Sequence, residues 1–165
     1  MYASEDVVSL SGSFGSFIAL GADVTEVERL GPDRLEPALA EDQRVSSTWY
    51  YFSSQGIRVR VCDDDHLVGT VNAINAPATR KYVTEANIRI GDNLDRTKSL
   101  YGEALQPLPE SNGNIWFIQQ EAGDNQITFG FRQDGTMVWV ALGALRENGW
   151  TCGKPVIHAK QEHRD

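Results

Sequence analysis

Aromatic and arginine side chains at alternating positions are the feature of this sequence best suited to surface chemistry. In the segment STWYYF at 47–52, strand geometry would put Trp49 and Tyr51 on one side of the chain and Tyr50 and Phe52 on the other. One pair should lie in the core and the other on an open sheet face, unless a loop covers that face. Exposed Trp and Tyr are common anchors of protein interfaces. We take Trp49 and Tyr51 as the candidates for the open side.

A second alternating segment supplies positive charge. In GIRVRVC at 56–62, Arg58 and Arg60 point away from the apolar Ile and Val side chains between them, and Arg132 is placed similarly in a later strand. Guanidinium groups pair well with carboxylates, so this stripe could bind a carboxylate-bearing partner. The alternative is a solvated strand face paired with neighbouring acids. Trp139, in TMVWVALG, faces the same patch or the core. The predicted partner-binding residues are Trp49, Tyr51, Arg58, Arg60, Arg132 and Trp139.

Neither a metal site nor a catalytic site is predicted. The run DDDH at 63–66 holds possible ligands, but consecutive side chains on a tight turn diverge. The three histidines lie in that turn and near the end of the sequence, and no GxSxG, HExxH or phosphate-binding glycine loop occurs. GSFGS at 12–16 is not followed by lysine. We therefore expect no enzyme activity, no cofactor and no metal.

The charge of the chain limits its partners. The net charge is −8, and residues 1–79 carry 12 acidic and 5 basic side chains. An acidic protein is repelled by phosphates, so nucleic acid is not an expected partner. The same field would favour encounter with a basic protein. No apolar run approaches the roughly 20 residues that span a bilayer, so no membrane insertion is expected.

The cellular compartment is left open by the sequence. If Met1 is the native start, the protein is cytoplasmic. If a leader was removed, it is periplasmic or secreted. Cys62 and Cys152 could form a disulfide after export or remain buried thiols.

The two halves of the chain carry similar residues at an offset of 70. Within FIALGADVTEVERLG at 17–31 and IRIGDNLDRTKSLYG at 88–102, Ile18 then falls on Ile88, Gly21 on Gly91 and Leu30 on Leu100. A fixed offset over many positions indicates a repeat. Further pairs on this offset are Ile57 with Ile127, Val59 with Phe129, Val61 with Phe131, Asp64 with Asp134 and Val68 with Val138.

Each half is expected to hold a short helix and several strands. Apolar residues three apart predict helices over 24–30 and 94–100, after Gly21 and Gly91. Alternating segments predict strands at 56–62, 66–74, 125–132 and 136–143. The predicted fold class is therefore α+β: two tandem repeats, each a short helix packed on a three- to four-stranded antiparallel sheet. The predicted domains are 1–79, and 80–165 with a C-terminal tail.

The opening pattern I-x-L-G-x-x-x-T-E-V-x-x-L-G-P at 18–32 resembles that of the SmpA/BamE-like families and of β-lactamase-inhibitory proteins. Those units join a short helix to an antiparallel sheet, and the inhibitory proteins are tandem duplications of such a unit. The resemblance covers most of 17–143 as architecture. It departs from the families where G-A-D-V-T replaces G-M-T, and the disulfides within each inhibitor unit are not reproduced by Cys62 and Cys152.

The resemblance implies a bacterial, non-enzymatic protein whose sheet faces bind another protein. The expected function is an inhibitor or immunity protein that occludes a toxin or enzyme. The alternative is a cell-envelope assembly or scaffold component of the SmpA/BamE-like kind. Small-ligand binding between the two halves is a third possibility.

Overall fold

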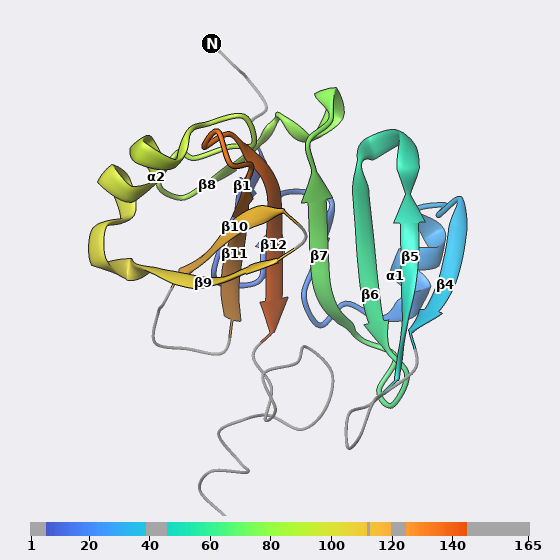
Figure 1. The fold of residues 1–165 in the computed structure, drawn as a ribbon. Coiled ribbons are helices and arrows are strands. Elements are labelled where there is room, and N and C mark those ends of the chain that lie inside the picture. Colours follow the sequence, from blue (N-terminus) through green and yellow to red (C-terminus); the bar gives the residue numbers. More distant parts are fainter. Residues whose placement is uncertain (1–5, 39–45, 112, 120–124, 145–165) are drawn as a thin grey trace, which may run out of the picture.

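The architecture is dominated by one large antiparallel sheet. The structure is a computed structural model that describes residues 6–38, 46–111, 113–119 and 125–144. The large sheet has eight strands in the order β4-β5-β6-β7-β12-β11-β10-β9 (Figure 1). Its strands are β4 (Arg34–Ala38), β5 (Ser47–Phe52), β6 (Ile57–Cys62), β7 (Val68–Ile74), β9 (Leu105–Ser111), β10 (Asn114–Gln119), β11 (Asn125–Phe131) and β12 (Met137–Ala144).

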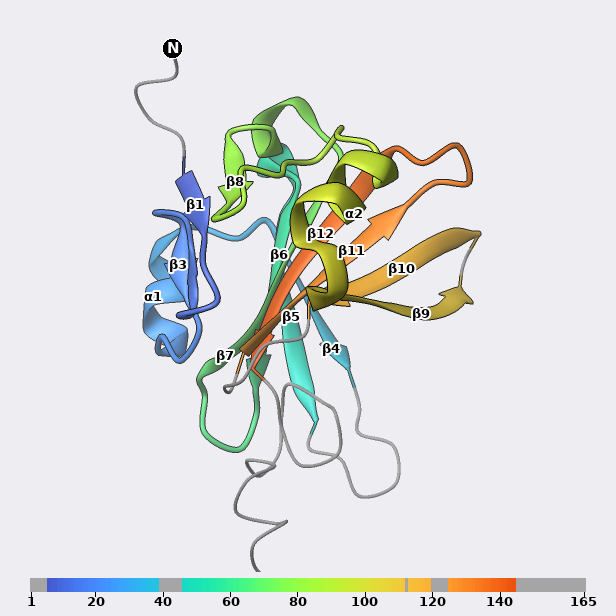
Figure 2. The same ribbon diagram turned by 90° about the vertical axis from the view of Figure 1, so that its left-hand side faces the viewer.

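A smaller sheet and a short helix lie on one side of the large sheet (Figure 2), and a second helix packs on the same side through Tyr101, whose ring contacts that of the buried Phe129. The small sheet has the order β3-β2-β1-β8, and its β1 and β8 run parallel. Its strands are β1 (Asp6–Val8), β2 (Ser13–Phe14), β3 (Ile18–Ala19) and β8 (Tyr82–Thr84). The helices are α1 (Val24–Arg29) and α2 (Leu94–Tyr101), with 3-10 turns η1 (Ser53–Gln55), η2 (Pro77–Thr79) and η3 (Gly102–Ala104). None of these described helices is long and apolar enough to cross a membrane.

The core lies between the large sheet and this second layer. Alternate residues of the strands point into it, as a half-covered antiparallel sheet requires. The small sheet and its loops supply much of the other side, including Val8, Phe14, Ile18, Ile88 and Ile90. Fully buried side chains of the large sheet include Val59, Val71, Ile127, Phe129, Phe131, Met137 and Leu142.

Both helices are short and begin at a polar cap. The carboxylate of Asp23 accepts a hydrogen bond from the backbone N–H of Thr25 at 3.0 Å. The side-chain oxygen of Asn93 likewise accepts one from the backbone N–H of Arg96 at 2.9 Å. Each helix buries one side chain, Val27 in α1 and Thr97 in α2. The helices therefore cover little of the sheet.

The predicted fold class, two tandem repeats with a helix packed on a separate sheet in each, is wrong. The protein is mostly β, and its two meanders join into one sheet through β7 and β12. This pairing runs from Trp139 opposite Ile74 to Gly143 opposite Thr70. It satisfies backbone groups that would be unpaired at the edges of two separate sheets. The small sheet takes the covering role expected of the helices.

The individual strand and helix predictions fare better. The four strands predicted from alternation are β6, β7, β11 and β12, and the two predicted helices form as α1 and α2. The expected domain division at residue 79 falls between η2 and β8. Both sheets include strands from either side of it.

Candidate protein-binding face

The side chains of β5 point alternately to the two faces of the large sheet, as strand geometry requires. Tyr50 and Phe52 point into the core and are 7% and 3% exposed, while Trp49 and Tyr51 are half-buried on the opposite side of the sheet. The question left open by the sequence is therefore answered: Trp49 and Tyr51 are the outward pair. The small sheet and α1 lie on the other side of β5, β6 and β7 (Figure 2).

Strand register brings the other candidates to the same face. Trp49 is opposite Arg60 and Tyr51 is opposite Arg58 in the β5–β6 ladder. Across β7, Arg58 is opposite Asn72. Trp139 on β12 is opposite Ile74 on β7. Because residues opposite one another in a ladder share a face, five of the six predicted side chains gather here. We call Trp49, Tyr51, Arg58, Arg60 and Trp139 the aromatic–arginine cluster.

Arg58 is the centre of this cluster. Its guanidinium carbon lies 4.1 Å from the ring centroid of Trp49 and 5.2 Å from that of Trp139. Its Nη1 donates a long hydrogen bond of 3.5 Å to the hydroxyl of Tyr51. Guanidinium groups are weakly hydrated and lie favourably over aromatic rings, which explains why a cation is tolerated between two tryptophans. The contacts hold Arg58 in place from both sides.

The edge of the cluster toward β4 is also built from cation and ring contacts. The guanidinium carbon of Arg34 lies 3.9 Å from the ring centroid of Tyr51, and the hydroxyl of Tyr51 donates to a carboxylate oxygen of Glu36 at 3.0 Å. Arg60 donates from Nε to the hydroxyl of Ser47 at 2.7 Å. These contacts orient the rings of the cluster.

Among the residues that the structure describes, three buried polar atoms on this face lack a hydrogen-bond partner. They are Nε of Arg58, Oδ1 of Asn72 and Oγ1 of Thr70. Asn72 and Thr70 are 5% and 8% exposed, which is unusual for polar side chains on the outward side of a sheet. Buried polar groups of folded proteins are usually paired, so each of these atoms lacks a hydrogen bond that it would normally make.

The cluster extends along the sheet to a fourth aromatic side chain, Trp116 on β10. The rings of Trp116 and Trp139 lie 5.9 Å apart in an edge-to-face arrangement. Between them, on β11, lies Gly130, which is opposite Trp116 on β10 and opposite Trp139 on β12. A Cβ at Gly130 would lie 2.7 Å from the ring of Trp116. The glycine therefore lets the indole ring lie against the backbone of β11.

A hollow of about 370 Å³ opens at one end of the cluster. Its lining is mostly apolar and includes Tyr51, Ser53, Ile57, Arg58, Ile74 and Trp139. Ile74 is 45% exposed, so an apolar side chain borders the hollow on its solvent side. The hollow is formed where β5 ends, β6 begins and β12 meets β7.

Asp33 fixes the strand end beside this hollow. Its two carboxylate oxygens accept hydrogen bonds from the backbone N–H and the hydroxyl of Ser53, both at 2.7 Å. Both bonds hold the pKa of the Asp33 carboxyl below its usual value, and the bond from the backbone N–H makes the largest contribution. The first residue of η1 is thereby tied to the start of β4.

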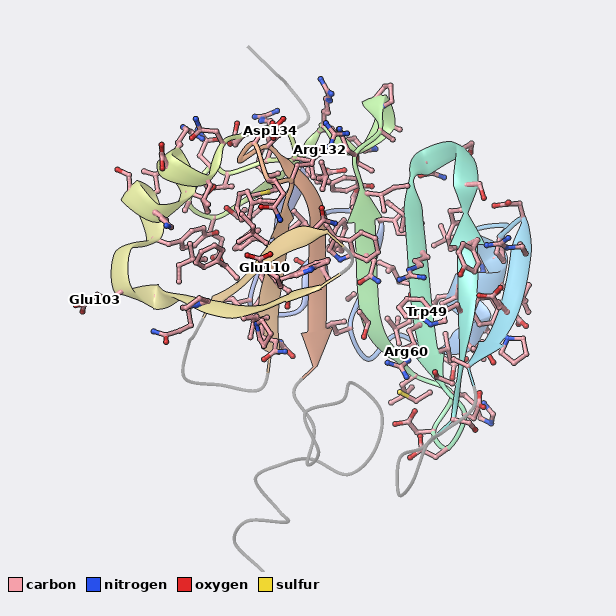
Figure 3. All side chains as sticks on the ribbon, in the orientation of Figure 1. Trp49, Arg60, Glu103, Glu110, Arg132 and Asp134 are labelled. Carbon is pink, nitrogen blue, oxygen red and sulfur yellow. The ribbon has the colours of Figure 1, made fainter. Side chains whose placement is uncertain are left out.

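Arg132 does not join the cluster. It follows the last residue of β11 and is exposed at the turn to β12, where its backbone N–H donates to the carbonyl of Thr136. In Figure 3 it lies beside Asp134, away from Trp49 and Arg60. A hydrogen bond from the backbone of Thr136 lowers the pKa of the Asp134 carboxyl, with a smaller contribution from the charge of Arg132.

The acidic turn after β6 is used for structure. Asp63 accepts hydrogen bonds from the hydroxyls of Ser46 and Thr48, and Asp65 accepts one from the backbone N–H of Leu67. Ligand atoms of Cys62, Asp64 and Asp65 lie within 4.8 Å of one another. Cys62, however, is disulfide-bonded, and a disulfide sulfur is not a thiolate ligand. The other cysteine of the sequence, Cys152, lies outside the described residues.

A second, larger hollow of about 630 Å³ lies near the start of the chain and α2. Its lining includes Ser9, Ser11, Glu85 and Tyr101. The predicted alternative of small-ligand binding between the halves stays a prediction.

Sequence reasoning missed several members of the face. Arg34 and Glu36 lie on β4, which was not predicted because RLEPA contains a proline and lacks alternation. Asn72 and Thr70 read as ordinary polar residues of β7. Trp116 could have been found from its segment NIWFIQ, in which it alternates with the buried Phe117.

The comparisons with known proteins add little to this geometry. No protein-family model matches the chain, and no curated protein matches it. A solved structure of a cysteine-rich secretory protein from Staphylococcus aureus subsp. aureus Mu50 is similar at 13% identity with a TM-score of 0.48. The match covers 90% of this chain and 55% of that protein, so the chain spans about half the length of the structure it matches.

Proposed function

We propose that this protein binds another protein through the aromatic–arginine cluster and inhibits it. The observation that carries the proposal is the position of Arg58, a half-buried cation that lies over two tryptophans on the side of the sheet away from the core. Tryptophan, tyrosine and arginine supply most of the binding energy in protein interfaces. On this face all three occur within a few strands.

The composition of the face supports a protein partner rather than a nucleic acid or a lipid surface. The rings offer broad apolar area that is already held in place by cation contacts, so little side-chain entropy is lost on binding. The chain as a whole carries a net charge of −8, which opposes binding to phosphates. At long range the same charge favours a basic protein, whereas the cluster itself favours carboxylates at the contact.

An inhibitor or immunity protein is the form of this function that we favour. The cluster extends over neighbouring strands of one sheet, and such a face is suited to cover an enzyme cleft or a toxin surface. The disulfide at Cys62 suits an oxidising compartment such as the periplasm or the cell exterior. A scaffold component of the cell envelope is the second candidate, and that location suits it equally.

The experiment is capture of proteins by the purified, immobilised chain, followed by an affinity and inhibition measurement with the protein captured. The test variant carries Trp49→Ala, Tyr51→Ala, Arg58→Ala and Arg60→Ala. A matched control carries Arg132→Ala and Arg96→Ala, on the turn after β11 and on α2. We expect a partner that the wild type and the control retain and that the test variant binds at least 30-fold more weakly, because each such anchor contributes about 2 kcal/mol.

Two results would contradict the proposal. One is equal affinity of the wild type and the test variant for the captured protein, with both folded by circular dichroism. The other is binding that leaves the partner's own activity unchanged, which would favour the scaffold function.

A further inference from the structure

The charge on the cluster is unbalanced. On the outward side of β4, β5, β6, β7 and β12, the described residues include three arginines and one carboxylate, Glu36. Glu36 is engaged by the hydroxyl of Tyr51. Among the described side chains of this face, positive charge therefore exceeds negative charge, and this part of the face complements negative charge.

Among the described side chains around it, Arg58 has no counter-charge. Its described contacts are the two tryptophan rings and the long hydrogen bond to Tyr51, and none of them is a carboxylate. Its Nε is buried without a partner. Desolvating a guanidinium without a paired anion costs free energy, and a carboxylate at its terminal nitrogens would offset that cost.

The hollow next to Arg58 defines what can carry this carboxylate. Its volume of about 370 Å³ is much larger than a carboxylate, and its other walls include the apolar Ile57, Ile74 and Trp139. A glutamate side chain combines a carboxylate with a stem of two methylene groups. An apolar neighbour of that glutamate would fill the remaining space against Ile74 and Trp139.

We propose that the hollow binds a glutamate side chain of the partner, flanked by an apolar residue, with the carboxylate paired to the guanidinium of Arg58. The inference rests on the proposed function, because it names the group on the partner that the cluster recognises. It predicts that the partner's contact segment is acidic and apolar, even where the partner as a whole is basic.

The test uses blocked peptides and nuclear magnetic resonance of the full ¹⁵N-labelled chain. The probe is acetyl-Leu-Glu-Leu-amide, and its matched control is acetyl-Leu-Gln-Leu-amide. A third peptide, acetyl-Leu-Gln-Leu with a free carboxyl end, supplies the same anion from a chain terminus. The signals observed are the Nε–H of Arg58 and the indole N–H of Trp139.

We expect the glutamate peptide to shift both signals in a saturable way and the glutamine peptide to leave them unmoved. Arg58→Gln should abolish the shift of the Trp139 signal, and Arg132→Gln should preserve it. Arg58→Lys retains the positive charge but lacks the planar guanidinium, so it should weaken binding several-fold. This variant replaces Arg58→Gln in the test if Arg58→Gln does not fold. Equal shifts with both amide peptides, or a Trp139 shift that survives Arg58→Gln, would overturn the inference. A larger response to the free carboxyl end would overturn the assignment to a side chain.

Failure of this inference is distinguishable from failure of the proposed function. If the peptides do not bind but the fourfold cluster variant loses the captured partner, the protein-binding face stands and the glutamate contact is wrong. If the glutamate peptide binds but the cluster variant keeps the partner, the hollow is a carboxylate site and the proposed interface is wrong.

Discussion

At the scale of single residues, the cluster depends on a position without a side chain. Gly130 lies between Trp116 and Trp139, and the indole ring of Trp116 occupies the space that a Cβ would need. Glycine is needed at position 130 for steric reasons and not for backbone conformation, because Gly130 is not among the glycines with positive φ. An ordinary strand residue at this position would force the ring of Trp116 outward.

Gly130→Ala is expected to displace Trp116 and to destabilise the fold by about 1–3 kcal/mol, the usual cost of overpacking. The measurement is urea unfolding together with near-ultraviolet circular dichroism, which reports the tryptophan environment. Thr128→Ala, on the same face of β11, is the control and should change the dichroism much less. An unchanged tryptophan signal in Gly130→Ala would show that the ring does not lie where we place it.

The sequence alone predicted some of the residues of the cluster but not all of their contacts. Alternation identified Trp49, Tyr51, Arg58 and Arg60, because side-chain direction in a strand follows from position alone. It could not pair Arg58 with Trp139, since that contact requires β7 and β12 to be neighbours. It misplaced Arg132 because β11 ends one residue earlier and the chain then turns.

At the scale of elements, the strand β4 borders the cluster and depends on Asp33. The carboxylate of Asp33 accepts two hydrogen bonds from Ser53, and its backbone N–H donates to the carbonyl of Tyr51 at 2.8 Å. The start of β4 is thereby joined to the end of β5. Since Arg34 and Glu36 follow directly, this attachment also positions the contacts that they make with Tyr51.

The lowered pKa of Asp33 predicts an acid-dependent loss of stability. Its folded-state pKa is below the unfolded value of about 3.9, so its contribution is present above that value and is lost as pH falls through the folded-state pKa. Asp33→Asn should lower the melting temperature at pH 7 and should flatten its dependence on pH below about 4. Asp95→Asn, on α2, is the control. A variant with the wild-type pH dependence would contradict this role.

Strands were easier to predict than their arrangement. Alternation located β6, β7, β11 and β12, whereas β1, β2 and β3 are two or three residues long and carry no readable period. The prolines of β4 and β9 also hid those strands, although proline is tolerated at sheet edges, where both strands lie.

At the scale of the whole molecule, both sheets cross the expected boundary between the halves. β7 pairs with β12 in the large sheet, and β1 pairs with β8 in the small one. A half of the chain taken alone would leave both seams unpaired and would expose buried residues such as Val71 and Leu142. The similarity between the halves indicated two separate units, because sequence similarity carries no information on whether two sheets merge.

We therefore expect one cooperative unfolding transition for the full chain. Unfolding in urea followed by tryptophan fluorescence and by far-ultraviolet circular dichroism should give coincident curves. Leu142→Ala, in the strand that joins the halves, should destabilise the whole molecule by about 2–5 kcal/mol and move both curves together. Two separated transitions, or a shift of one probe only, would indicate independent halves.

The most direct test of the proposed binding face is hydroxyl-radical footprinting of the chain alone and in complex with its captured partner. We expect Trp49, Tyr51 and Trp139 to be oxidised several-fold more slowly in the complex, while Tyr101, on the opposite side of the sheet, is oxidised at the same rate. Unchanged oxidation of the three cluster residues, with slowed oxidation at Tyr101, would contradict the account and move the interface to the helical side.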